Sequence, residues 1–228
     1  YKRQDQAQLA YSYASEALAL RQQLNQSPQP GHIKNYQQLA FSAHLIGNYN
    51  DAIQYTQQAL HLIDHVPAIS VSQIANIIYD LSTWWTNKGE LETAASLVNK
   101  ALALYDEHNI AIDASYLELQ QTMGILDRIT GKLESAEQRF GQNLILRHDW
   151  YGVDHPQVAV TLNNLAMTLS FQQRFPEAAS LYQEALAIRE SKLGPSHTLT
   201  IESINNLAFF YFDQKEYKKA EPLFRQAW

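Results

Sequence analysis

The 228-residue sequence contains no cysteine, so disulfide crosslinks and thiolate chemistry are excluded. A chain without cysteine fits a reducing compartment, and we expect a cytoplasmic protein. Lys and Arg form no cluster and the formal net charge is -6. Because proteins that neutralise phosphates carry a basic face, nucleic acid is not expected as a partner. No apolar run approaches the roughly 18 residues that span a bilayer, and no signal pattern opens the chain, so membrane insertion is not expected.

Motifs for catalysis and cofactor binding are also missing. The sequence contains no Gly-rich phosphate loop and no Gly-x-Ser-x-Gly nucleophile motif. The strongest metal candidate is the pair His61 and His65, four residues apart with Asp64 adjacent, and the sequence places no third ligand beside it. We therefore predict a protein that is not an enzyme, binds no metal and uses no cofactor.

What the sequence does contain is a repeat of 42 residues. Three columns follow this step, and the clearest is an alanine column: Ala10, Ala52, Ala94, Ala136, Ala178 and Ala220. A second column is leucine: Leu18, Leu60, Leu102, Leu144 and Leu186. A third alternates between aromatic residues and leucine: Tyr49, Leu91, Leu133, Phe175 and Tyr217. A period this regular indicates an array of stacked repeats, in which each repeat contacts only its neighbours.

Each repeat predicts two amphipathic helices, A and B. In the fourth repeat, apolar residues at helical spacing predict helix A from Pro156 to Gln172 and helix B from Phe175 to Lys192. The break between the helices holds a glycine, which can close helix A with a positive φ, at the same place in three repeats: Gly47, Gly89 and Gly131. Propellers are excluded, because their blades are short strands.

The starts of two A helices also carry recognisable signals. Asp154 and Ser196 are predicted to be the N-caps, and Pro156 suits a first helical turn. For the neighbouring His155 and His197 we predict roles in capping and packing rather than in metal binding.

The last two repeats carry a specific set of residues. In the fourth repeat these are Gly152, Asp154, His155, Pro156, Thr161, Leu162, Asn163, Asn164, Leu165, Ala166 and Ala178, followed by Glu184 to Glu190, and the fifth repeats most of the pattern. On these residues the chain resembles tetratricopeptide-repeat proteins of the 42-residue kind found in kinesin light chains. The first three repeats keep the columns but lack the Asn pair. The resemblance implies an all-α, right-handed superhelical solenoid of antiparallel helix pairs, with helices A on the concave side.

The columns divide the chain into a single tetratricopeptide array. Residues 1–25 align with helix B of a truncated repeat, and five repeats follow at 32–66, 69–108, 111–150, 155–193 and 197–228, the last also truncated. We expect a fragment of a longer protein, since solenoids normally end in capping helices.

The predicted binding residues lie on helices A, one and two positions before a further column with the 42-residue step: Leu39, Leu81, Met123, Leu165 and Leu207. The binding residues are Gln37, Gln38, Asp80, Gln121, Asn163, Asn164, Asn205 and Asn206, joined by the cation Arg128 and the aromatic Phe209. Side-chain amides both donate and accept, so they can pair with the backbone of an extended peptide. The opposing interpretation is that each Asn binds a neighbouring helix or water.

Two functions remain open. The first is a module that binds an extended peptide or a segment of a partner protein in the groove lined by helices A. The second is a regulatory or oligomerising arm of a larger signalling enzyme, such as a kinase or a nucleotide-binding switch protein. In that case other domains of the same parent chain are partners.

Overall fold

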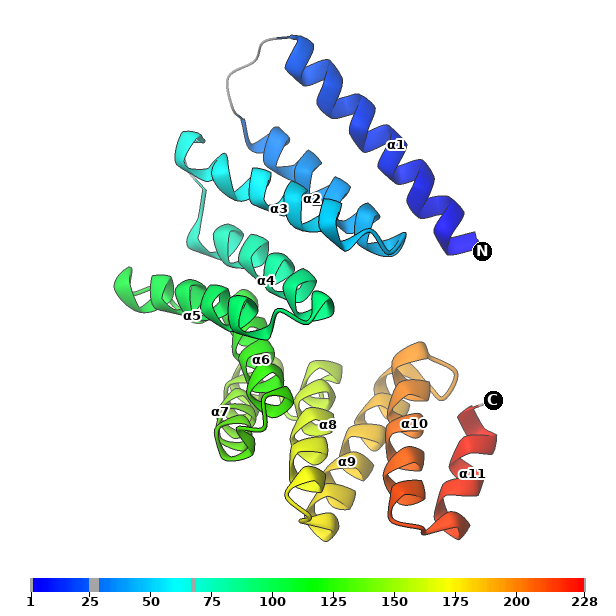
Figure 1. Cartoon of the computed structure of the whole chain (residues 1–228). Coiled ribbons are helices and arrows are strands. Elements are labelled where there is room, and N and C mark those ends of the chain that lie inside the picture. The colour runs from blue at the N-terminus through cyan, green and yellow to red at the C-terminus, as the bar shows by residue number, and fades with distance from the viewer. Residues whose placement is uncertain (1, 25–28, 67–68, 228) are drawn as a thin grey trace. The chain divides into compact units, whose positions relative to one another are not determined.

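The computed structural model describes residues 2–24, 29–66 and 69–227; the side chains of residues 2–5, 22 and 64 lie outside this description. These segments form eleven α-helices and one short 3-10 helix, and contain no strand, so the all-α prediction is confirmed (Figure 1). The helices are α1 (Lys2–Gln23), α2 (Pro30–Leu45), α3 (Tyr49–His61), α4 (Val71–Lys88), α5 (Leu91–Glu107), α6 (Ala114–Ile129), α7 (Leu133–Tyr151), α8 (Pro156–Phe171), α9 (Phe175–Leu193), α10 (Thr198–Asp213) and α11 (Tyr217–Ala227).

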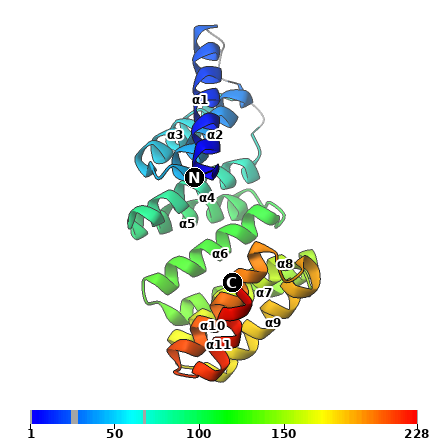
Figure 2. The same cartoon turned by 90° about the vertical axis from the view of Figure 1, so that its right-hand side faces the viewer.

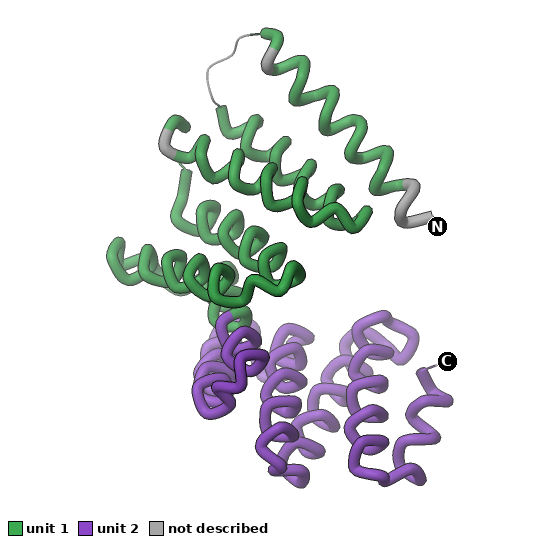
Figure 3. Tube along the Cα trace, viewed as in Figure 1, with its two compact units in different colours: residues 1–122 green, residues 123–228 purple. Residues whose placement is uncertain are grey.

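The chain divides into two compact units, Tyr1–Thr122 and Met123–Trp228 (Figure 3). In unit 1, α2 packs on α3 and α4 on α5, and α1 packs against α2. In unit 2, α8 pairs with α9 and α10 with α11, and α7 packs against α8. Figures 1 and 2 show that the paired helices run antiparallel. The even-numbered helices are therefore helices A and the odd-numbered ones helices B.

The alanine column lies where helices A and B touch. Ala52, Ala94, Ala136 and Ala178 have no exposed surface, and Ala220 is almost as deeply buried. A methyl side chain lets two helix backbones approach closely while larger neighbours fill the space beside them. Ala10, on α1, is exposed.

A residue in the left-handed region ends helix A in every repeat. Gly47, Gly89 and Gly131 have φ values of 82°, 89° and 80°, as predicted. In the last two repeats Gln173 and Lys215 adopt φ values of 64° and 61°. An L side chain is strained there, so the backbone turn is imposed by the packing of the two helices rather than by local preference.

The two helices predicted for the fourth repeat agree with the structure to within one residue, but the two predicted N-caps do not. The N-cap of α8 is His155, whose Nδ1 accepts a hydrogen bond from the backbone N–H of Gln157 at 3.2 Å. Asp154 instead forms an ion pair with Lys192. His155 rather than Asp154 is the N-cap because Pro156 forces the residue before it into an extended conformation, which is the conformation of an N-cap.

The same correction applies to α10. Its N-cap is His197 rather than Ser196, and His197 Nδ1 accepts from the backbone N–H of Leu199 at 3.2 Å. His197 has an extended backbone (φ -73°, ψ 139°) although no proline follows it. The capping role predicted for both histidines is therefore confirmed, and the caps predicted at Asp154 and Ser196 are wrong.

Candidate functional site

The helix-A surface of unit 1 contains a cavity of about 400 Å³ between α2 and α4. Ile33 and Ile77 are buried apolar residues in its wall. Lys34 and Gln37 of α2 and Asn76 of α4 supply the polar lining, and none of these three side chains forms a hydrogen bond within the described part of the chain. The cavity therefore offers free donors and acceptors above an apolar wall.

The two predicted glutamines of α2 lie in different places. Gln37 is half-buried and lines the cavity between α2 and α4. Gln38 is exposed and lines a second cavity, between α1 and α2, together with the exposed ring of Phe41. Adjacent helix positions point about 100° apart, so the two amides do not form one row.

Asp80, on α4, is half-buried and has neither a hydrogen bond nor an ion pair among the described residues. Burial disfavours its charged form and raises the pKa of its carboxyl group to about 6. Gln121, on α6, is only 3% exposed, so the protein encloses its amide. Of these two predicted residues, Asp80 keeps an unpaired polar group and Gln121 belongs to the helix packing.

The Asn pair of α8 is engaged inside the protein. Asn163 is 6% exposed and its Nδ2 donates to Ser203 Oγ of α10 at 3.0 Å. Asn164 is half-buried, and its Nδ2 donates to the carbonyl oxygen of Val160, one turn earlier in the same helix, at 3.0 Å. Asn163 thus ties one helix A to the next, whereas Asn164 keeps an unbonded amide oxygen.

The Asn pair of α10 is different. Asn205 and Asn206 are half-buried and form no hydrogen bond within the part of the chain that the structure describes. Phe209, one turn further on, is 57% exposed, and its ring lies edge-on to Phe224 with centroids 5.1 Å apart. Two free amides and an exposed aromatic ring therefore lie on the same helix.

Arg128, in the last turn of α6, is half-buried and has no carboxylate partner among the described residues. Its Nε is buried without a hydrogen-bond acceptor, and desolvation lowers the pKa of the guanidinium. A cation near a helix C-terminus is stabilised by the helix dipole. Arg128 is therefore a half-buried cation without a paired anion in this part of the chain.

A set of arginines at one register was missed in the sequence. Arg21, Arg147 and Arg189 lie at the ends of helices B, and each donates to the carbonyl oxygen ten residues later, at 2.8, 3.2 and 2.7 Å. Arg147 and Arg189 are almost fully buried. These arginines join helix B to the first turn of the following helix A. Their spacing in multiples of 42 residues is the signal that could have identified them.

The described residues contain no group of three or more His, Asp or Glu side chains that could hold a metal ion. The rings of His61 and His65 are 5.6 Å apart and edge-on. In that same part of the chain, none of the helices has the length and apolarity required to cross a bilayer.

Part of the sequence matches a known protein family. The tetratricopeptide repeat family profile matches residues 113–191 and 161–227. A clustered mitochondria protein homolog of Ajellomyces capsulatus (strain NAm1 / WU24) is 25% identical over 134 residues, which cover 57% of this chain and 10% of that protein. The chain thus spans about a tenth of the length of the curated relatives it matches.

Solved structures with the same fold include a Podosopora anserina putative kinesin light chain with nearly identical TPR-like repeats. Its TM-score is 0.70 at 18% identity, and the match covers 87% of this chain and 93% of that one. A Rap protein complexed with competence and sporulation factor has a TM-score of 0.76 at 14% identity, covering 93% of this chain and 57% of that one. With half of the sequence matched by the family profile, the chain belongs to the tetratricopeptide repeat family, and its fold is of the kinesin light chain-like type.

Proposed function

We propose that this chain is a protein-interaction module that binds an extended segment of a partner protein along its helices A. The observation that carries the proposal is the cavity between α2 and α4, where Lys34, Gln37 and Asn76 have no hydrogen-bond partner among the described residues. The amide of Gln37, which lacks a partner and is half-buried, gains most from a ligand that supplies one. The Rap protein above, of similar fold, was solved with a bound factor.

The chemistry of the cavity favours backbone recognition. Gln37 and Asn76 can each donate to a peptide carbonyl and accept from a peptide N–H, as amides do. Ile33 and Ile77 provide apolar contact for an intervening side chain. Asp80, further along α4, would favour a basic residue in the ligand, because an incoming cation offsets the cost of its burial.

In unit 2 the equivalent surface uses a different set of residues. Asn205 and Asn206 have free amides, Asn164 has a free amide oxygen, and Phe209 offers an exposed ring. Asn163 is left out of the proposed site, since its amide donates to Ser203.

A selection from phage-displayed random dodecapeptides tests the proposal. Peptides selected on the wild-type chain are labelled, and their affinities measured by fluorescence anisotropy. The double variant Gln37→Ala, Asn76→Ala should bind about tenfold or more weakly, because each lost hydrogen bond contributes about 1 kcal/mol. Gln57→Ala, at an exposed position of α3, is the matched control and should leave affinity unchanged. Equal affinity for the double variant, or weaker binding only in the control, would refute the proposal.

A second function is favoured by one observation, namely that the matched relatives are about ten times longer than the segment they share with this chain. We propose as an alternative that the array is a regulatory or oligomerising arm of a larger signalling protein. A parent gene that encodes no kinase, nucleotide-binding or other catalytic domain would exclude this alternative.

A further inference from the structure

Unit 2 contains a cavity of about 690 Å³ that is separate from the helix-A residues described above. It lies between two successive B helices, α7 and α9, and α8 also contributes to its wall. Its apolar lining consists of Leu165, Leu169 and Leu181, of which Leu169 is part of the hydrophobic core. An aliphatic chain could therefore lie against it out of water.

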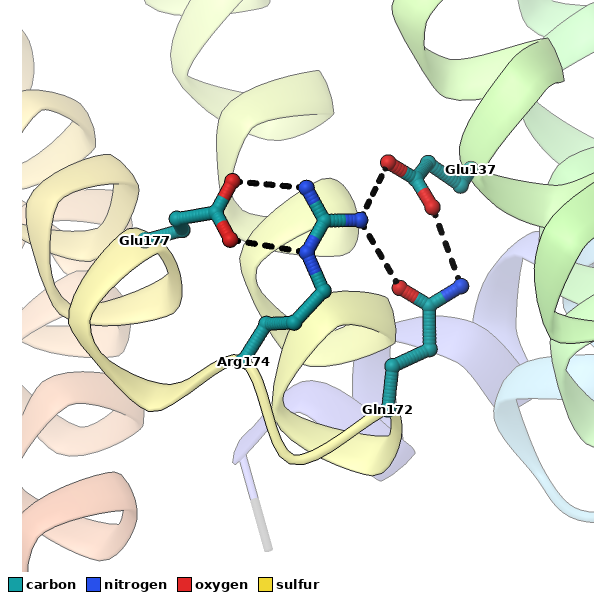
Figure 4. Close-up of polar contacts among 4 residues, drawn as sticks. All are labelled: Glu137, Gln172, Arg174 and Glu177. Atoms are coloured by element: carbon teal, nitrogen blue, oxygen red, sulfur yellow. Dashed lines mark hydrogen bonds and ion pairs between the residues drawn. The ribbon is translucent and has the colours of Figure 1, made fainter.

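The rim of this cavity carries an excess of negative charge. Arg174 is held by two carboxylates: its Nη1 lies 2.6 Å from Glu137 Oε1, and its Nε and Nη2 donate to Glu177 at 2.8 and 2.6 Å (Figure 4). Gln172 donates to the second oxygen of Glu137 at 3.0 Å and fixes that carboxylate. Glu134, also in the rim, is exposed and has no ion-pair partner among the described residues. The rim thus carries three carboxylates and one guanidinium, a surplus of two negative charges.

Gly141 forms part of the wall, in the interior of α7. Glycine weakens a helix interior, so its presence usually answers a packing demand. Here there is none, since a Cβ added at Gly141 would meet no atom within 4 Å. At the equivalent positions the other repeats carry side chains: Ser15, Gln57, Asn99, Gln183 and Arg225. The missing side chain leaves the cavity open from the α7 side.

We propose that this cavity is a second docking site, which receives a long basic side chain, Lys or Arg, from a partner protein. The aliphatic stem lies along the three leucines and the cationic head lies between Glu134 and Glu137, as long basic side chains do when apolar and acidic surfaces adjoin. Charge selects this occupant. The rim's surplus of two negative charges repels an acidic segment, and a neutral segment would leave the rim carboxylates without a cation. The site is independent of the proposed peptide groove.

Pentylammonium, a lysine side-chain analogue, is a direct probe, with pentanol and pentanoate as its neutral and anionic counterparts. Titration of the ¹⁵N-labelled chain should give saturable shifts in the Gly141 and Ser180 amides with pentylammonium at millimolar concentration, and weaker or no shifts with the other two. Glu134→Gln should weaken binding about two- to fivefold, the range for exposed ion pairs. Glu92→Gln, the residue at the same register on α5, should have no effect.

Gly141→Gln provides the decisive variant. It installs the residue found at this register in two other repeats and should fold normally, because no atom lies within 4 Å of the added Cβ. We expect an unchanged circular dichroism spectrum and melting temperature, together with loss of the pentylammonium shifts. Wild-type binding by Gly141→Gln would overturn the proposal. Equal binding of pentanol and pentylammonium would also overturn it, since the cavity would then be an apolar site without charge selection.

Discussion

Two glycines in adjacent helices of unit 2 should respond in opposite directions to the same substitution. Gly124 lies in α6 and is buried against Phe140 of α7: a Cβ added there would lie 2.7 Å from Cε1 and 2.8 Å from Cζ of the ring. Phe140 has no exposed surface, so the ring has no open space into which to move. Gly141 lies in α7 itself, and its added Cβ meets nothing.

The magnitudes follow from two opposing effects. Gly→Ala in a helix interior stabilises by about 1 kcal/mol, because alanine loses less backbone entropy on folding. Carbon atoms in contact are normally about 3.5–4.0 Å apart, so Gly124→Ala also overpacks the core, at a cost of about 1 to 3 kcal/mol. We therefore expect Gly124→Ala to lower the free energy of unfolding by up to about 2 kcal/mol, and Gly141→Ala to raise it by about 0.5 to 1 kcal/mol.

Urea denaturation followed by circular dichroism at 222 nm measures both changes against the wild type. The midpoint should fall for Gly124→Ala and rise for Gly141→Ala. Repeat arrays can unfold in more than one step, so the comparison is between midpoints of the same transition. A more stable Gly124→Ala protein would refute the close approach of α6 and α7, and a destabilised Gly141→Ala protein would refute the open space beside α7.

Three further predictions concern polar groups, and the same urea assay measures each. Arg189→Met, which removes hydrogen bonds to a main-chain carbonyl at 2.7 Å and to Ser203 Oγ at 2.9 Å, should lower the free energy of unfolding by about 2 to 3 kcal/mol; a change below about 0.5 kcal/mol would contradict the role of Arg189 in joining helices. Burial raises the folded-state pKa of Asp80 to about 6 from the ordinary 3.8, so the folded state binds the proton more tightly than the unfolded state does. The free energy of unfolding of the wild type should therefore fall as the pH rises from 4 to 7. The fall should exceed that of Asp80→Asn by about 2 to 3 kcal/mol. Parallel pH profiles would show that the carboxyl is not desolvated. Asn163→Ala should destabilise by about 1 kcal/mol through loss of the bond to Ser203, and Asn205→Ala, at the same register but without that bond, by clearly less.

Most of the fold could be predicted from the 42-residue repeat. The alanine column, the glycines after helix A and the apolar spacing of 156–172 and 175–192 are local signals, and each repeat meets the same kind of neighbour. Side chains at one register therefore face the same way in successive repeats, so the core could be assigned before any contact was known. The helix caps departed from prediction because the extended backbone of His155 and His197, rather than residue type alone, selects the capping side chain.

The register could not distinguish residues of one type at equivalent positions. Asn163 and Asn205 share a column, yet Asn163 donates to Ser203, forty residues later, while Asn205 has no such partner among the described residues. Gly124 and Gly141 are both helical glycines, and only the packing of Phe140 separates a crowded position from an open one. Periodicity specifies which face a side chain occupies, whereas its hydrogen bonds, burial and free volume depend on residues brought from the next helix. For that reason the helices and their core could be read from the chain, and the binding surfaces could be proposed only once neighbouring repeats were packed together.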